Sequence, residues 1–426
     1  MLLALVLVGG VGGGLAYLEW GRAPDDVSNP DAEFTVPEEP PKKKPKKERD
    51  FVWPIFGYTP DRAKAFDTDL GPPFRKVWYR KADSLLEFPP VLADDTLYFV
   101  TNEGNLIAVD ARRGKKKWKR SVGTLSAASP AWSKGRLFVV SLDGRVTALR
   151  AKDGKVLWRK DIPSRTESSP YVRNERVYFG SEDGTVYAVR AKNGRTIWTY
   201  RAPGAVKAAL AYVDGRLFFG DYAGVATALR ARDGQRIWDT ATAGLALGRS
   251  GRFYSTPAAA FGRIYMGSTD GRVYSFTQRS GETAWSRSTG AYVYSGPAAA
   301  DVPGKGPTVF IGSYTGVFYA LDARSGATRW SYRAAGRISG AASVIGDVVY
   351  FGNLETRDLE GLSTRSGKRV FKFGEGGFAP PISDGESLWL TGYKSLVRFV
   401  PKVKGDGSRK RSGRRARGKS RDRGDS

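Results

Sequence analysis

A segment of about 40 residues repeats along most of this chain, and the repeat limits the possible fold more than any other feature. One copy reads GTVYAVRAKNGRTIW, from Gly184 to Trp198. Its alternating apolar and polar residues are typical of half-buried strands, and Gly194 suits the turn between them because glycine enters positive φ at little steric cost. One hairpin cannot bury its own apolar face, so several copies must pack together.

Each copy ends on an aromatic residue four positions after a turn glycine. These aromatics are Trp118, Trp158, Trp198, Trp238, Trp285, Trp330 and Phe371, with successive spacings of 40, 40, 40, 47, 45 and 41 residues. The longer spacings are expected to insert residues in connections and to leave the strands intact. A period of this length, built from strands, predicts a propeller blade of four strands, A to D. We expect each aromatic to pack between neighbouring blades.

The two ends of the repeat region complement each other. Trp78 stands 40 residues before Trp118 in a D-like strand that no A, B and C strands precede, and we expect it to pack between blades like the other seven aromatics. The last runs, FAPPISDG, SLWLTG and SLVRFV, supply A, B and C without a D strand. Pairing the two ends removes the open sheet edges. The sequence therefore predicts an all-β fold: an eight-bladed β-propeller of four-stranded antiparallel blades over residues 74–401, closed by an N-terminal strand.

Copies such as ALDARSGATRW and AVDARRGKKKW resemble the repeat of the pyrroloquinoline-quinone (PQQ) β-propeller family. That family includes quinoprotein dehydrogenases and BamB-like outer-membrane assembly proteins, so the resemblance implies a fold and leaves both catalysts and scaffolds open. The chain contains no cysteine and no histidine. It therefore lacks the vicinal-cysteine disulfide typical of the dehydrogenases, and also the acylated cysteine of the lipoproteins that BamB-like proteins are.

Composition narrows the chemistry further. Without histidine and cysteine the chain cannot form Ser-His-Asp triads, His-ligated metal sites or thiolate nucleophiles. We therefore expect no catalytic residue, no metal site and no cofactor. The interpretation is a non-catalytic scaffold whose face loops bind a cell-envelope protein. The alternatives are a dehydrogenase that uses PQQ and Ca²⁺, and an adhesin for an anionic wall polymer or membrane.

The net charge of +26 has a regular component. A basic residue stands two positions before every turn glycine: Arg112, Lys152, Lys192, Arg232, Arg279, Arg324 and Arg365. These C-to-D turns emerge on one face, whereas B-to-C turns with Glu103, Asp143, Asp183 and Asp270 emerge on the other. We expect a basic ring that attracts an anionic lipid or wall polymer, the alternative being an ordinary solvated surface. Nucleic acid is not expected as a partner.

The segments outside the repeats differ in character. Residues 1–18 are apolar and uncharged, which favours an uncleaved transmembrane signal anchor over a cleaved signal peptide. Residues 19–50 and the basic residues 402–426 should be disordered. Residues 51–73 should lie ordered against the propeller, with Trp53 less important for stability than Trp198. The sequence thus predicts a monomeric propeller on the extracytoplasmic side of a membrane, held by one N-terminal anchor.

Overall fold

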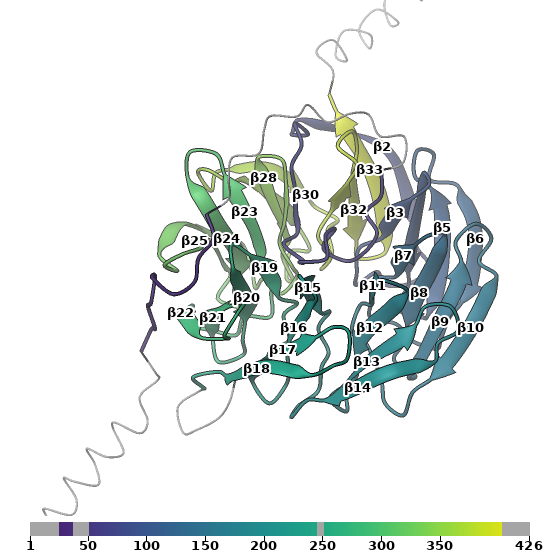
Figure 1. Cartoon of the computed structure of the whole chain (residues 1–426). Helices are drawn as coiled ribbons and strands as arrows, with labels where there is room; N and C mark the ends of the chain where they lie inside the picture. Colours follow the sequence, from purple (N-terminus) through teal and green to yellow (C-terminus); the bar gives the residue numbers. More distant parts are fainter. Residues whose placement is uncertain (1–24, 37–50, 245–250, 403–426) are drawn as a thin grey trace, which may run out of the picture.

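The structure is a computed structural model that describes residues 25–36, 51–244 and 251–402. These residues form 33 strands in eight sheets and no helix. Figure 1 shows the sheets arranged around one axis, as blades of a propeller. Among the described residues there is no helix that could cross a membrane. The predicted anchor at residues 1–18 and the tail from 403 onward lie outside the described residues.

The strands follow the predicted order within each blade. The innermost strands, A, are β3 (Val91–Ala93), β7 (Ala131–Ser133), β11 (Tyr171–Arg173), β15 (Ala211–Val213), β19 (Ala258–Ala260), β23 (Ala298–Val302), β27 (Ser343–Ile345) and β31 (Ile382–Ser383). The B strands are β4 (Thr96–Val100), β8 (Arg136–Val140), β12 (Arg176–Gly180), β16 (Arg216–Gly220), β20 (Arg263–Gly267), β24 (Gly306–Gly312), β28 (Val348–Gly352) and β32 (Leu388–Gly392).

The outer strands complete the blades. The C strands are β5 (Asn105–Asp110), β9 (Arg145–Arg150), β13 (Thr185–Arg190), β17 (Val225–Arg230), β21 (Arg272–Thr277), β25 (Val317–Asp322), β29 (Leu359–Ser363) and β33 (Ser395–Pro401). The D strands are β6 (Lys116–Ser121), β10 (Val156–Asp161), β14 (Thr196–Arg201), β18 (Arg236–Ala241), β22 (Thr283–Ser288), β26 (Thr328–Arg333), β30 (Arg369–Phe373) and β2 (Phe74–Lys81). Blades 1 to 8 are numbered in the order of their A strands.

The burial of a strand depends on how far the neighbouring blades cover it on both sides. In blade 3, strand β13 buries Val186, Tyr187, Ala188 and Val189 in a row, whereas β14 is half-exposed. A strand covered by blades on both sides reads as a continuous apolar run, because both of its faces pack. In every C–D pair the register shifts at the residue before the docking aromatic, a β-bulge that the sequence did not indicate.

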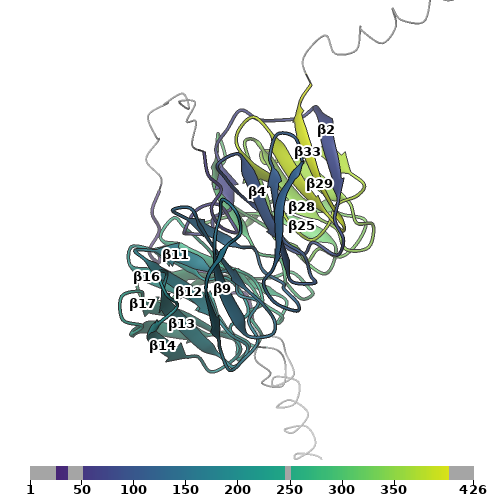
Figure 2. The same cartoon turned by 90° about the vertical axis from the view of Figure 1, so that its right-hand side faces the viewer.

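The ends of the chain close the ring as predicted. Strand β2 pairs antiparallel with β33, with Phe74 opposite Pro401 and Tyr79 opposite Val397. Figures 1 and 2 both show β2 beside β33. Because the first and last strands share one sheet, neither leaves an open edge in the ring. The prediction of an eight-bladed, all-β propeller is confirmed.

One expectation about the irregular spacings is wrong. In blade 6 the additional residues do not stay in the turn. They lengthen β23 to five residues and β24 to seven, where β11 and β12 of blade 3 have three and five. The two strands continue to pair up to Val302 and Gly306, since backbone groups in an extended hairpin hydrogen-bond to each other.

Residues 51–73, the lead-in segment, lie across the propeller axis and bond to the inner strand of one blade after another. Backbone N–H groups of Trp132, Tyr212, Ala259, Ala299 and Val344 donate to carbonyls of this segment at 2.7–2.9 Å. Its own strand β1 (Ala65–Phe66) runs parallel to β27 as a fifth strand. The inner edges of the A strands of blades 2, 4, 5, 6 and 7 are therefore covered by a single unrepeated piece of chain at the axis.

Two basic side chains are buried within this segment. Arg62 donates to the carbonyls of Phe56, Leu210, Ser169 and Pro170. Ser169 and Pro170 directly precede β11, so the guanidinium of Arg62 bonds to blade 3, to which the lead-in backbone does not bond. Lys64 donates to the carbonyls of Arg62 (2.9 Å) and Pro297 (2.7 Å). Buried polar groups must be hydrogen-bonded to be tolerated, and here the acceptors are backbone oxygens.

The burial of Trp53, in the same segment, removes the basis for expecting that this residue matters less for stability than Trp198. Its side chain is only 2% exposed and packs against Tyr58 and Phe66, with ring centroids 4.6 and 5.9 Å away. Trp198 is half-buried. Since the cost of truncating an aromatic rises with its burial, Trp53→Ala should cost at least as much stability as Trp198→Ala.

Lys64→Met is expected to change the pH dependence of stability. Burial, and then the neighbouring Arg62, lower the pKa of Lys64 to about 7, against the opposing effect of Asp61. Between pH 7 and an unfolded value of roughly 10.4, the unfolded chain binds more protons here than the folded chain. The free energy of unfolding therefore gains up to ~1.4 kcal/mol per pH unit from this residue as pH rises through that window.

The variant lacks this gain, so urea titrations from about pH 7 to about pH 9.5 should show the wild type gaining stability over Lys64→Met. Lys192→Met is the control, because Lys192 is exposed. It should follow the wild type at each pH. The same pH dependence in both variants would contradict a buried, easily deprotonated Lys64.

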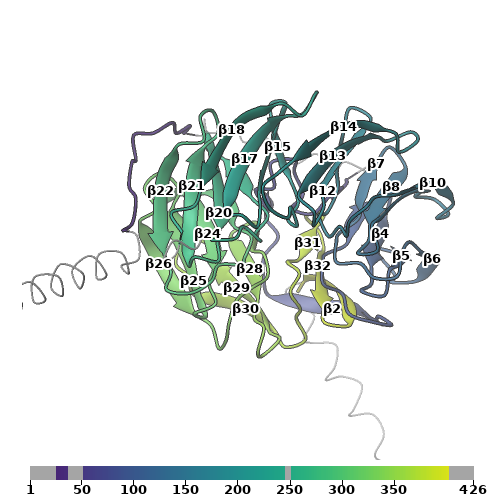
Figure 3. The same ribbon diagram turned by 90° about the horizontal axis from the view of Figure 1, so that it is seen from below.

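Residues 25–36 correct part of the prediction that residues 19–50 are a disordered linker. They lie along the outer edge of blade 5, as the purple segment beside β22 in Figures 1 and 3 shows. Ser28 forms an antiparallel bridge with Trp285, and Thr35 N–H donates to the carbonyl of Phe261 at 3.0 Å. Asp26 pairs with Arg272 at 2.9 Å. The segment is ordered because it completes the hydrogen bonding of an edge strand.

Candidate functional site

Seven of the eight predicted docking aromatics make the same contact with the following blade. Each indole lies on the C–D turn glycine of that blade, and its Nε1 donates to a turn carbonyl. The Nε1–O distances are 3.2 Å for Trp78 to Ala111, 3.1 Å for Trp118 to Ala151, 2.9 Å for Trp158 to Ala191, 3.1 Å for Trp198 to Ala231, 3.1 Å for Trp238 to Gln278, 3.0 Å for Trp285 to Ala323 and 2.9 Å for Trp330 to Thr364. The structure thus places these residues in the joints between blades.

Phe371 makes a different contact, and the ring closure explains why. Its ring packs edge-on against Phe74 and Phe399, with centroids 5.6 and 5.9 Å away. Blade 8 has no C–D turn, because β33 and β2 come from opposite ends of the repeat region. No turn carbonyl is available there to accept a hydrogen bond from an indole, and a phenyl ring requires none.

All seven side chains of the predicted basic ring are exposed at the C–D turns, as expected. Three of them are in ion pairs: Arg112 with Asp95, Arg232 with Asp233 and Arg324 with Asp31, each at 3.3 Å. Exposed pairs add little stability, but each cancels a positive charge locally. The positive field of this face is therefore weaker and less even than the sequence predicts.

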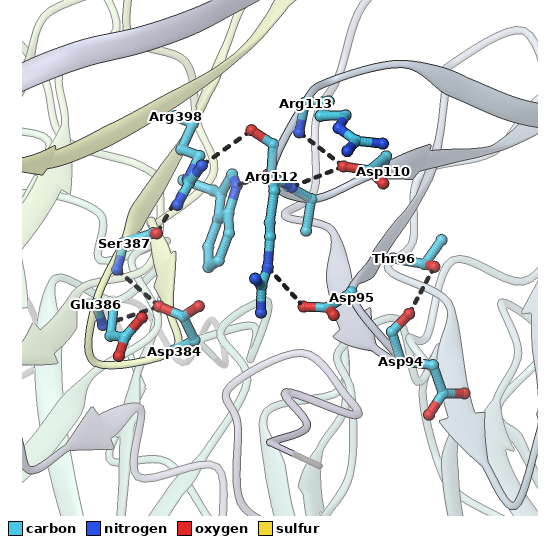
Figure 4. Close-up of polar contacts among 12 residues, drawn as sticks. Asp94, Asp95, Thr96, Asp110, Arg112, Arg113, Asp384, Glu386, Ser387 and Arg398 are labelled. Carbon is cyan, nitrogen blue, oxygen red and sulfur yellow. Dashed lines mark hydrogen bonds and ion pairs between the residues drawn. The ribbon is translucent and has the colours of Figure 1, made fainter. Parts of the chain in front are cut away.

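Figure 4 shows the surroundings of Arg112, where blade 1 meets the closing blade. The backbone carbonyl of Arg112 accepts a hydrogen bond from Arg398 Nη1 at 2.9 Å. Arg398 Nε donates to Ser387 Oγ at 3.0 Å, and Arg112 Nε donates to Asp95 at 3.3 Å. This member of the ring thus takes part in holding blade 8 against blade 1.

The carboxylates on the opposite face mostly build their own turns. Asp143 accepts from Ser141 Oγ at 2.5 Å, and Asp270 accepts from Tyr274 Oη at 2.5 Å. Asp183 accepts from Thr185 N–H and pairs with Arg201, both at 3.0 Å. Glu103 is exposed. Of these four carboxylates Asp183 pairs with a cation, so the predicted contrast between a basic and an acidic face is reduced mainly on the basic side.

The B–C face, formed by the B–C turns and the D–A connections, is hollowed at the axis by a pocket of about 390 Å³. Phe56 of the lead-in segment lines it, together with Glu167, Lys207, Tyr254 and Tyr294 from D–A connections. Sequence reasoning missed this pocket, since its wall residues come from different blades at positions where the repeats differ.

A row of five tyrosines borders this pocket over blades 4 to 6. The tyrosine belt consists of Tyr222, Tyr254, Tyr294, Tyr292 and Tyr314, joined by ring-centroid distances of 4.9 to 6.3 Å. Tyr254 and Tyr292 are 36% and 49% exposed. Burial raises the pKa of Tyr222, Tyr254 and Tyr294, so their hydroxyls stay protonated at neutral pH. An aromatic surface with polar tips suits contact with another protein.

The charged side of the pocket is internally paired. Lys207 Nζ lies 2.7 Å from Glu167 and 2.9 Å from Glu182. Although burial opposes the charged form, these carboxylates raise the pKa of Lys207. Arg252 and Lys207 both lie over the ring of Tyr222, 5.7 and 5.4 Å from its centroid. The arrangement can hold polar and aromatic groups of a partner by hydrogen bonds and stacking.

The pocket does not fit PQQ, the cofactor that the resemblance to dehydrogenases implies. PQQ is a tricarboxylate and needs cations that are free to bind it. Lys207 is the cationic residue in the lining, and both of its carboxylate partners occupy it. Among the described residues, no three His, Cys, Asp or Glu side chains gather where they could hold a metal ion.

Comparison with solved structures places the fold among known propellers. BamB from Moraxella catarrhalis superposes with a TM-score of 0.64 at 16% identity, over 77% of this chain and 100% of that one. A quinohemoprotein alcohol dehydrogenase from Pseudomonas putida gives 0.71 at 15% identity, over 82% and 80%. A europium-containing methanol dehydrogenase gives 0.70 at 12% identity, over 83% and 98%. At these identities the likeness shows the fold alone.

Sequence comparison identifies the family. A search of curated proteins gives no match. The family described as outer membrane protein assembly factor BamB matches residues 65–134, 123–301 and 269–416. These matches cover most of the chain, including all of the blades. This protein therefore belongs to the BamB family of PQQ-type β-propellers.

Proposed function

We propose that this protein is a non-catalytic scaffold of the cell envelope that binds a protein partner through its B–C face. The observation that carries the proposal is the tyrosine belt at the mouth of the axial pocket. Energetic centres of protein interfaces are enriched in tyrosine and arginine, often around a pocket. The name of the family, an assembly factor, supports a role in bringing proteins together.

We further propose that the apolar residues 1–18 anchor the propeller on the extracytoplasmic side of a membrane, and that the propeller is a monomer. Their length and lack of charge support an anchor. The partner is then a membrane or envelope protein, so detergent-solubilised membranes are the material in which to look for it.

The test is a pull-down with the whole protein from such membranes. The double variant Tyr254→Ala/Tyr292→Ala should bind the partner at least about tenfold more weakly and so capture less of it, as expected when aromatic anchors of an interface are truncated. The control, Lys152→Ala, changes an exposed residue on the opposite face and should capture normally. Equal capture by both variants would contradict a partner on the B–C face.

The absence of redox catalysis is a separate prediction. Because the pocket offers PQQ no free cation, adding PQQ and Ca²⁺ should produce no alcohol- or sugar-dependent dye reduction above background. A PQQ-dependent dehydrogenase, assayed in parallel, is the positive control. Substrate-dependent turnover by this protein would overturn the scaffold proposal in favour of the dehydrogenase alternative.

A further inference from the structure

A second hollow, of about 740 Å³, lies between blades 3 and 4 on the face of the A–B and C–D turns. Six arginines line it, from three turns that are far apart in sequence: Arg173, Arg176, Arg216, Arg230, Arg232 and Arg236. Tyr178, Tyr212 and Asp214 are also in the lining. We call this hollow the arginine cleft.

Three of these arginines are held without a carboxylate partner. Arg176 Nη1 donates to the carbonyls of Ala231 and Arg232, and Arg216 Nη1 donates to the carbonyl of Gln278 at 3.1 Å. Arg173 lies over the ring of Tyr212, 5.6 Å from its centroid. Within residues 25–36, 51–244 and 251–402, no carboxylate is within ion-pair distance of these three. Backbone and ring contacts orient the guanidinium groups and leave their charge uncompensated.

The other three arginines share two carboxylates of their own blade. Arg230 pairs with Asp233 at 2.9 Å, Arg232 shares the same carboxylate, and Arg236 pairs with Asp239 at 2.5 Å. With the exposed Asp214, three carboxylates face six guanidinium groups, so the cleft retains three positive charges.

We propose that the arginine cleft binds a phosphate group that is carried on a glycerol or sugar. The planar guanidinium donates two parallel hydrogen bonds to phosphate oxygens, and arginine is the usual residue for such recognition. The volume exceeds what one phosphate fills, which leaves room for the attached polyol beside the half-buried Tyr212. This binding goes beyond the scaffold function and does not depend on it.

The binding test uses the full chain and glycerol 3-phosphate in a calorimetric titration at low salt. Arg173→Gln removes one uncompensated charge from an exposed position and should weaken binding about tenfold, as for other hydrogen bonds to charged groups. Asp214→Asn removes the opposing carboxylate and should strengthen binding. Lys192→Gln, an exposed base outside the cleft on the same face, is the matched control and should bind like the wild type.

A second arm identifies the source of the phosphate, with vesicles of phosphatidylcholine alone or mixed with phosphatidylglycerol. Vesicle binding that glycerol 3-phosphate competes away, and that Arg173→Gln weakens, assigns the cleft to lipid headgroups. Binding of glycerol 3-phosphate without such vesicle binding assigns it to a soluble or wall-borne phosphate. No titration by glycerol 3-phosphate, or equal weakening by Arg173→Gln and Lys192→Gln, overturns the proposal.

Discussion

Deleting residues 74–80 is expected to make the propeller aggregate. The deletion removes nearly all of β2, which pairs with β33 along its whole length. Strand β33 then becomes an exposed edge, and unpaired edges associate with one another. The deletion also removes Trp78, whose indole lies on Gly114 and bonds to Ala111 of blade 1. Size-exclusion chromatography and thermal melting measure the effect.

A matched deletion separates ring closure from simple loss of an edge segment. Residues 25–31 are also seven residues long and also lie along the outer edge of a blade, at β22. They do not close the ring, so their deletion should lower stability, because the buried Arg272 loses Asp26, but should not cause aggregation. Unchanged solubility and melting after deletion of residues 74–80 would contradict closure by β2.

Gly234→Ala is expected to destabilise the protein by about 2–5 kcal/mol through two effects that act together. Gly234 has a φ of +75°, where a side chain strains the backbone. A Cβ there would also lie 2.6 Å from Trp198 Cε3, so the indole would have to leave its place on the turn. Unfolding in urea measures the loss.

Gly215 provides the matched control in the same blade. It has a φ of +80°, but a Cβ there would meet nothing within 4 Å. Gly215→Ala should therefore show only the backbone effect, about 1–2 kcal/mol. In the double variant Gly234→Ala/Trp198→Ala the two losses should be less than additive, because the clash disappears with the indole. Equal losses at the two glycines, or full additivity, would contradict the docking contact.

The repeat allowed the fold to be predicted almost completely. Its period of about 40 residues, the alternation within GTVYAVRA and the offset of Trp78 can all be recognised along the chain without knowing which residues are in contact. The same pattern placed the docking aromatics on D strands and the seven bases of the ring at C–D turns. It could not show the bulge before each aromatic or the reason for phenylalanine at 371, since both depend on what the next blade presents.

The candidate sites were far less predictable. Lys207 and Tyr294 belong to connections that differ from blade to blade, so no repeat marks them as neighbours. The arginine cleft joins Arg173 of blade 3 to Arg216 and Arg236 of blade 4, and only the packing of the two blades brings Arg173 to the other two. The charge of the ring was visible in the sequence, whereas its neutralisation by partners such as Asp31 was not.

The sequence by itself therefore determined the structure of a blade, the number of blades and the closure of the ring. The reason is that the repeated apolar pattern fixes which strands must be buried between neighbouring blades. The tertiary structure alone decided what becomes of the unrepeated chain. Residues 51–73 carry Arg62 and Lys64 into the axis, and residues 25–36 line blade 5. The physical reason is that eight packed blades leave backbone groups unpaired at their inner and outer edges. These groups exist only once the ring has formed, so no pattern along the chain can indicate which segment will meet them.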